Sequence, residues 1–253
     1  MQCKNNVNRG VFLKNTGCGL CNRKCRVDRD NGEKGFCGET SEIRCGRAAL
    51  HMWEEPCISG TRGSGTVFFT GCVLKCVFCQ NSVLAESKVG KPVTVSRLAE
   101  IFLELQNKGA HNINLVTPTH FVPSIRESII LSKKNGLSVP IVYNTGSYES
   151  VDTIKSLEGL VDIYLPDLKY VSSELSKKYS KVPDYFEVAR KAIGEMVRQT
   201  GTPEFDDDGI MKKGVIVRHL LLPGCLSDSK NVIKYLYDTY RDDIFISIMN
   251  QYT

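Results

Sequence analysis

The feature that most constrains this chain is a regular alternation of short apolar segments with amphipathic ones between residues 66 and 249. The short segments are continuous apolar runs, as expected for strands that are buried on both faces. Six strands are predicted, at 66–70, 112–116, 140–144, 161–165, 215–222 and 244–249. Alternating strands and helices imply an α/β fold with a parallel sheet, either open or curved into a barrel.

The amphipathic segments between these strands predict five helices. The clearest helix face is formed by Leu98, Ile101, Phe102 and Leu105, which recur at helical spacing. The other helices are expected near 123–135, 149–158, 184–199 and 228–240. Residues 201–214 are expected to form a polar loop.

Composition is ordinary for a globular protein, with 42% hydrophobic and 24% charged residues among 253. No segment approaches the roughly 18 apolar residues of a membrane span, and the first residues lack the apolar core of a secretory signal. We therefore expect a cytoplasmic protein without membrane contact. Residues 1–64 carry 11 basic and 7 acidic residues, but no nucleic-acid-binding motif accompanies the charge, so no nucleic acid is expected as a partner.

The chain has 11 cysteines, which without an export signal are expected to stay reduced and to serve metal or redox chemistry. Seven lie in the first 64 residues, and three more fall within eight residues, at 72–79. We expect a Cys-rich N-terminal segment at 1–60 with little periodicity and a core domain at 61–253. The core is expected to be truncated after its sixth strand, because residues 251–253 follow that strand with no covering helix.

Cys72, Cys76 and Cys79 form a Cys-x3-Cys-x2-Cys motif directly after the first predicted strand and Gly71. A helical stripe of small apolar residues is the alternative, but three cysteines in eight residues favour a ligand set. Three thiolates are one fewer than usually hold a [4Fe-4S] cluster, so one iron would stay open to a small molecule. Zinc is the other option, with a fourth ligand from elsewhere, such as Cys57 or His51.

The motif and its surroundings resemble the radical S-adenosylmethionine (SAM) superfamily, and within it the pyruvate formate-lyase activating enzyme-like group. The resemblance covers essentially all of residues 15–253, and its supporting runs are 53–60, 70–81, 165–169 and 222–224. It implies a partial (βα)6 barrel of parallel strands. It also implies that Cys72, Cys76 and Cys79 bind a [4Fe-4S] cluster whose open iron chelates SAM. One electron would then cleave SAM to methionine and a 5′-deoxyadenosyl radical, which abstracts a hydrogen from the substrate.

The residues that follow the predicted strands are polar, and active sites of parallel α/β folds lie at those strand ends. They are the cysteines, Thr117 to His120, Asn144, Asp167 with Lys169, and Arg218 with His219. Each has an ordinary alternative: a turn at Asn144, a surface ion pair between Asp167 and Lys169, and a core histidine at 219. Arg218 lies within an apolar strand, so it needs a structural partner or an anionic ligand.

The resemblance assigns the cofactor-binding residues Phe78, Thr117, Asn144, Asp167, Lys169 and Arg218. Asp167 and Lys169 would lie near the SAM carboxylate, Arg218 near the ribose or carboxylate, and the Phe78 backbone near the adenine. Thr117 to His120 replace the Gly-Gly-Glu segment that meets the SAM amine in the superfamily. Asn144 stands where activating enzymes often carry an acidic residue.

A second cysteine set, Cys18, Cys21, Cys25 and Cys37, is flanked by glycines. Four thiolates fit a closed zinc site or a second iron–sulfur cluster, and free thiols are the alternative.

We expect a radical SAM oxidoreductase that takes electrons from a flavodoxin or ferredoxin and that activates a glycyl radical enzyme. The rival hypotheses are a radical enzyme acting on a small molecule, a non-catalytic zinc-binding module, and an iron–sulfur electron-transfer protein.

Overall fold

The computed structural model describes residues 17–250 and contains all six predicted parallel strands. They are β2 (Ser64–Phe69), β4 (Ile113–Val116), β5 (Ile141–Thr145), β6 (Ile163–Pro166), β8 (Met211–Leu220) and β9 (Phe245–Met249). They lie side by side in this order, and every neighbouring pair is parallel. The predicted α/β fold with a parallel sheet is therefore confirmed, while residues 251–253 lie outside the described part of the chain.

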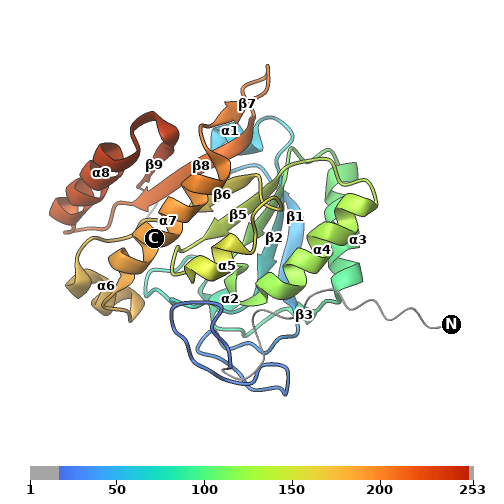
Figure 1. Cartoon of the computed structure of the whole chain (residues 1–253), viewed down its shortest axis with the longest axis horizontal. Coiled ribbons are helices and arrows are strands. Elements are labelled where there is room, and N and C mark those ends of the chain that lie inside the picture. Colours follow the sequence, from blue (N-terminus) through green and yellow to red (C-terminus); the bar gives the residue numbers. More distant parts are fainter. Residues whose placement is uncertain (1–16, 251–253) are drawn as a thin grey trace.

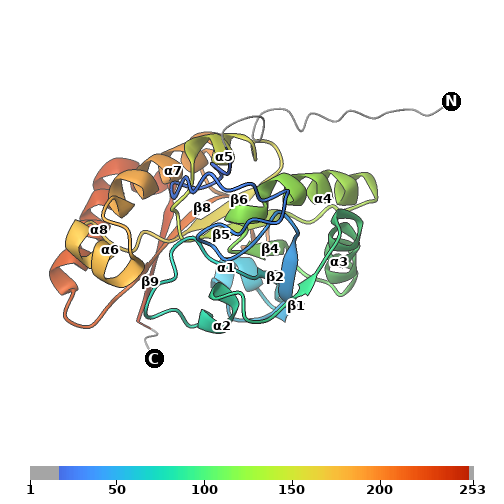
Figure 2. The ribbon, with the colours of Figure 1, turned by 90° about the horizontal axis from the view of Figure 1, so that it is seen from below.

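The five predicted helices are also present. They are α3 (Val95–Asn107), α4 (Val122–Lys134), α5 (Val151–Lys155), α7 (Tyr185–Thr200) and α8 (Leu226–Tyr240). Three further helices, which the sequence did not indicate, are α1 (Pro56–Ser59), α2 (Ser82–Ala85) and α6 (Ser173–Ser180). Figure 2 shows α3 to α8 arranged along the outer side of the curved sheet, with α1 on its inner side.

Helix α3 illustrates how the sequence specifies these elements. The Thr94 side chain accepts a hydrogen bond from the backbone N–H of Arg97 and so caps the first turn. Leu98, Phe102 and Leu105 are buried, and the helix packs against α4. Burying each such side chain contributes about 1.5–3 kcal/mol, which explains why a spacing of three and four residues predicted this helix.

Three further strands, which were not predicted, pair with their neighbours in antiparallel fashion. Strand β1 (Arg44–His51) pairs with β2 and with β3 (Lys91–Pro92), and β7 (Glu204–Phe205) pairs with β8. The segment 1–60 therefore contributes a strand to the sheet, and the expected polar loop 201–214 contains a hairpin. Strand β1 was missed because it has few fully apolar positions, and the structure leaves its residues exposed or half-buried.

The inner side of the sheet has its own small apolar core around helix α1. Ile58 is fully buried there against a set of strand residues, namely Val142, Ile163, Leu165, Met211 and Ile216. The Asn112 side chain donates a hydrogen bond to the Ile58 carbonyl at 2.9 Å and fixes the helix in place. Since side chains two residues apart point to the same face of a strand, Asn144, Asp167 and Arg218 continue this inner face towards the strand ends.

Residues 17–43, called the Cys-rich loop below, lie across the carboxyl ends of the parallel strands (Figures 1 and 2). The backbone N–H of Cys72, just after β2, donates to the Cys37 carbonyl at 3.2 Å. The Thr153 hydroxyl of α5 donates to the Leu20 carbonyl at 2.7 Å. The Cys-rich loop is therefore packed onto the end of the sheet where a functional site is expected. No helix in the described part of the chain is long and apolar enough to cross a membrane.

Candidate functional site

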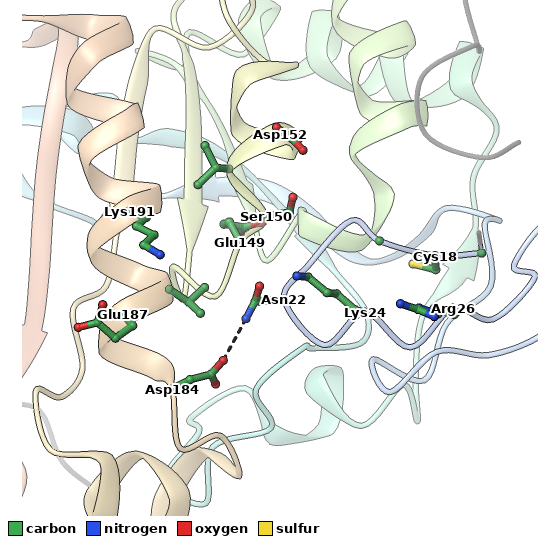
Figure 3. Close-up of a pocket in the computed structure, with 14 residues that line it drawn as sticks. Cys18, Asn22, Lys24, Arg26, Glu149, Ser150, Asp152, Asp184, Glu187 and Lys191 are labelled. Carbon is green, nitrogen blue, oxygen red and sulfur yellow. Dashed lines mark hydrogen bonds between the residues drawn. The ribbon is translucent and has the colours of Figure 1, made fainter. Parts of the chain in front are cut away.

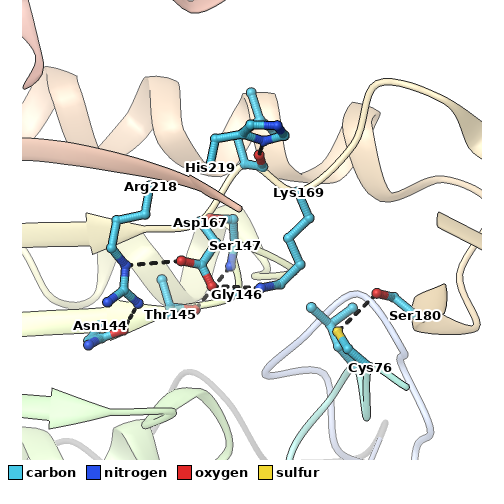
Figure 4. Close-up of polar contacts among 12 residues, drawn as sticks. Cys76, Asn144, Thr145, Gly146, Ser147, Asp167, Lys169, Ser180, Arg218 and His219 are labelled. Atoms are coloured by element: carbon cyan, nitrogen blue, oxygen red, sulfur yellow. Dashed lines mark hydrogen bonds and ion pairs between the residues drawn. The ribbon is translucent and has the colours of Figure 1, made fainter. Parts of the chain in front are cut away.

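Four of the six residues predicted to bind the cofactor meet at the carboxyl ends of the strands (Figure 4). The Arg218 guanidinium donates to Asp167 Oδ1 at 3.1 Å and to Asn144 Oδ1 at 2.7 Å. Lys169 Nζ contacts the other carboxylate oxygen of Asp167 at 2.7 Å. We call these residues, together with Glu54, the strand-end polar cluster.

The register of the sheet brings these side chains together. Asp167, directly after β6, forms an isolated parallel bridge with Arg218 of β8, and Asn144 of β5 is paired with Leu165 of β6. The three residues therefore come from neighbouring strands at nearly the same height. Their spacing in the sequence reflects only the helices that connect the strands.

The cluster is largely shielded from water, and its charges compensate each other. Burial alone would raise the pKa of Asp167, but the Lys169 ammonium and the Arg218 guanidinium hold it below its usual range. The side chains of Asp167, Lys169 and Arg218 are only 16–17% exposed. A buried carboxylate that keeps its charge between two cations is a ready polar site for a zwitterionic ligand.

Glu54 is a member of the cluster that sequence reasoning did not assign. It precedes α1, and its carboxylate lies 3.4 Å from the Arg218 guanidinium. Burial raises the pKa of Glu54, and Arg218 only partly offsets this effect. Its contact with Arg218 spans 164 positions, so no local pattern in the sequence indicates it. Its neighbour Trp53 is 87% exposed and points to solvent instead.

Cys72, Cys76 and Cys79 lie on the loop between β2 and α2, beside the polar cluster. This loop, residues 70–81, is called the cysteine loop below. Burial raises the pKa of Cys76 to about 11, while the nearby Lys169 ammonium acts in the opposite direction. Burial and the charge of Cys72 also raise the pKa of Cys79, which Lys169 lowers in part. The three thiols are thus close enough to influence one another, and Lys169 lies between them and Asp167.

Two glycines allow this loop to pack tightly. Gly71 has a φ of +79°, and a Cβ at this position would meet the Cys37 carbonyl oxygen at 2.8 Å and Glu39 Cγ at 2.6 Å. A Cβ on Gly146, after β5, would meet the Leu74 side chain at 2.8 Å. The cysteine loop is therefore held between the Cys-rich loop and the end of β5 without room for larger residues.

The three thiols of the cysteine loop suit an iron–sulfur cluster better than a single metal ion. Among residues 17–250, no three His, Cys, Asp or Glu side chains are gathered closely enough to hold one metal ion. A [4Fe-4S] cluster binds each thiolate through a different iron, so its ligands stand farther apart than those of zinc. Three neighbouring thiols with a cation beside them suit such a cluster, since Lys169 offsets the negative charge of the thiolates.

The remaining predicted residues take other positions. The Phe78 ring packs edge-on against Tyr170 and Tyr179, with ring centroids 6.4 and 6.3 Å away. Thr117 lies beside Asn144, because its backbone N–H donates to the Asn144 carbonyl at 2.9 Å. His219 is buried, and its Nδ1 contacts the Leu168 carbonyl at 2.7 Å. This position agrees with the alternative interpretation of His219 as a core histidine.

The segment Thr117 to His120 turns towards the Cys-rich loop. His120 is buried, its ring contacts the Thr70 carbonyl at 2.6 Å, and its own carbonyl accepts a hydrogen bond from Arg29. Thr119 donates to the buried carboxyl of Glu149 at 2.6 Å. This segment therefore links the sheet to the Cys-rich loop, which its sequence did not indicate.

A cavity of about 630 Å³, shown in Figure 3, has no residue of the polar cluster in its lining. It is bounded by the Cys-rich loop on one side and by α5 and α7 on the other, with Cys18, Lys24, Glu187 and Lys191 among its lining residues. Asn22 bridges the two sides by donating to Asp184 at 3.0 Å. We place the candidate site at the polar cluster because the buried charges and thiols are there, whereas the cavity walls carry solvated charges of both signs.

The chain is similar to known proteins in sequence and in fold. An uncharacterized protein of Methanocaldococcus jannaschii is 30% identical over 244 residues, and the match covers 93% of this chain and 65% of that protein's length. The crystal structure of Streptococcus suis SuiB resembles the fold with a TM-score of 0.50 at 15% identity, over 75% of this chain and 39% of SuiB. Residues 66–223, which include the cysteine loop and most of the polar cluster, match the radical SAM superfamily. Because this match spans more than half of the sequence, the chain belongs to the radical SAM superfamily.

Proposed function

We propose that this protein is a radical SAM enzyme whose cysteine loop holds a [4Fe-4S] cluster and whose strand-end polar cluster holds SAM. The observation that carries the proposal is the position of Lys169. Its ammonium contacts Asp167 at 2.7 Å and acts electrostatically on both Cys76 and Cys79. One cation thus connects the thiols with the buried carboxylate.

When bound, the cluster supplies the electron that cleaves SAM into methionine and a 5′-deoxyadenosyl radical. The polar cluster offers groups of both signs to the methionine part of SAM. Arg218 and Lys169 provide donors for a carboxylate, and Asp167 and Glu54 provide acceptors for an ammonium. Thr117 and Asn144 lie next to these charges and offer further polar contacts.

The chain also excludes water from this region. The Cys-rich loop covers the strand ends on one side, and the α1 core fills the inner side of the sheet on the other. Electrostatic interactions are stronger in such an environment than in water. A reactive radical formed here would be protected from side reactions with solvent.

The substrate class to test first is a glycyl radical enzyme, as the pyruvate formate-lyase activating enzyme-like motifs predict. A flavodoxin or ferredoxin is the predicted donor. The exposed Trp53 next to Glu54 and the exposed Val77 on the cysteine loop provide apolar surface close to the site for a protein partner.

The test is the formation of 5′-deoxyadenosine from SAM by anaerobically reconstituted protein with dithionite as reductant. We expect the wild type to form it, and Asp167→Asn and Arg218→Lys to form it at least tenfold more slowly with a weaker affinity for SAM. The control is Arg190→Lys, because Arg190 forms an exposed pair with Glu187 on α7.

Two results would overturn the proposal. If the reconstituted wild type forms no 5′-deoxyadenosine and contains zinc, the chain is a metal-binding module. If Asp167→Asn and Arg218→Lys bind and cleave SAM as the control variant does, SAM is held elsewhere.

A further inference from the structure

The second cysteine set is brought together in the Cys-rich loop. A Cβ placed on Gly35 would lie 3.1 Å from Cys25 Sγ and 3.4 Å from Cys37 Sγ, so this glycine leaves a space between the two sulfurs. Cys18 interacts directly with the Cys25 thiol, and Cys21 is electrostatically coupled to Cys18 and Cys37. All four thiols are therefore neighbours although they span residues 18–37.

The backbone around these thiols is folded into a tight turn. The N–H of Cys18 donates to the Val27 carbonyl at 3.0 Å, and the N–H of Arg26 donates back to the Cys18 carbonyl at 3.1 Å. Lys24 and Arg26 adopt positive φ values of 45° and 55°, which non-glycine residues seldom do. Backbone strain of this kind persists where the surroundings fix it, and it often accompanies a binding function.

Arg29 supplies an independent observation. It is 4% exposed, its Nε has no hydrogen-bond partner, and no described carboxylate forms an ion pair with it. The Arg29 guanidinium lies close enough to Cys18 and Cys37 to act electrostatically on both thiols. A buried guanidinium without an anionic partner is costly, so negative charge on these sulfurs would compensate the charge of Arg29.

From these observations we infer that Cys18, Cys21, Cys25 and Cys37 bind a second iron–sulfur cluster, with Arg29 as the cation beside it. A cluster is favoured over zinc because zinc needs its sulfurs about 2.3 Å from one point. The four thiols, like those of the cysteine loop, are neighbours without being gathered around a single-ion site. Four ligands close the coordination of a cluster, so this centre has no open iron and serves structure or electron transfer.

The second centre lies directly against the cysteine loop. Cys37 accepts a hydrogen bond from the N–H of Cys72 through its carbonyl, and Arg23 donates to the Val73 carbonyl at 2.8 Å. Ligation of Cys37 would therefore fix the backbone from which Cys72 projects. This centre goes beyond the proposed SAM chemistry and does not require it.

The test is iron, sulfide and zinc content together with Mössbauer spectra of anaerobically reconstituted full-length protein. Removing the first site by the triple change Cys72→Ala, Cys76→Ala, Cys79→Ala leaves the second site untouched. We expect about eight irons per wild-type chain and about four in this triple variant, since each [4Fe-4S] cluster holds four. The double change Cys18→Ala, Cys25→Ala should also retain about four, and the control Cys45→Ala, Cys57→Ala should retain about eight.

The inference is overturned if the triple variant retains no iron. One zinc per chain in that variant, abolished by Cys18→Ala and Cys25→Ala, would identify a zinc site and refute the cluster. Because the triple variant carries the intact N-terminal set, a folding failure of the double variant does not affect this outcome. Wild-type protein with about eight irons and no SAM cleavage would leave the second centre standing and refute the proposed function instead.

Discussion

The strand-end polar cluster and the Cys-rich loop gather their functional side chains in different ways. In the polar cluster, Asn144, Asp167 and Arg218 are aligned by the regular register of three parallel strands. In the Cys-rich loop, tight turns and glycines bring four thiols together with almost no regular secondary structure. The first arrangement is supported by the whole core, whereas the second depends on a few backbone positions. The two regions should therefore respond differently to substitution.

The largest effect is expected from Arg218→Met in the polar cluster. This change leaves the buried carboxylates of Asp167 and Glu54 without their common partner, and breaking a buried ion pair in this way costs about 3–5 kcal/mol. The measurement is the free energy of unfolding from urea denaturation at pH 7. Arg190→Met, which breaks an exposed pair with Glu187, should cost at most about 1 kcal/mol. Equal losses in the two variants would show that the polar cluster is not an integral part of the core.

Gly71→Ala is expected to lower stability less than Arg218→Met does, and to act locally on the packing of the Cys-rich loop. An alanine at a φ of +79° costs about 1–2 kcal/mol, and its Cβ would also press against the Cys37 carbonyl. Gly159→Ala is the matched control, because Gly159 has a φ of +74° and its Cβ would meet nothing within 4 Å. We expect Gly71→Ala to make the thiols of the Cys-rich loop react faster with a maleimide in the metal-free protein, and Gly159→Ala to leave them unchanged. The same rate in both variants would mean that Gly71 does not hold the loop in place.

The smallest effect concerns acid stability, which should distinguish the two regions. Asp167 has a pKa below its usual value in the folded protein. Its contribution to stability is therefore fully present at neutral pH and is lost as the pH falls below that usual value, through the lower pKa of the folded state. In metal-free protein, Asp167→Asn should therefore lower stability at pH 7 and flatten its decline below about pH 4. Cys21→Ser in the Cys-rich loop should leave the shape of the acid limb unchanged, because burial raises the pKa of that thiol to about 12. The measurement is the unfolding free energy across pH 3–7, and parallel curves for wild type and Asp167→Asn would contradict the assignment.

The features that could be predicted from the sequence belong to the regular strands and helices around the polar cluster, and those that could not belong to irregular segments such as the Cys-rich loop. Short apolar runs and helical spacing located all six parallel strands and five helices, and the strand ends then indicated Asn144, Asp167, Lys169 and Arg218. The sequence did not show that Glu54 joins them, because that contact depends on how α1 packs inside the curved sheet. Nor did it show that His120 and Arg29 connect the sheet to the Cys-rich loop, since no periodicity encodes contacts between irregular segments.

The central claim is that the cysteine loop and the strand-end polar cluster form one site, which binds a [4Fe-4S] cluster together with SAM. The most direct test is electron paramagnetic resonance of anaerobically reconstituted, reduced protein, recorded with and without SAM. If the second centre is present, the spectrum is best recorded on Cys18→Ala, Cys25→Ala so that only the first cluster contributes. We predict a [4Fe-4S]⁺ signal that shifts when SAM is added, and no shift in Arg218→Met at the same SAM concentration. A cluster signal that is indifferent to SAM in the protein with an intact polar cluster would contradict the claim and indicate electron transfer instead.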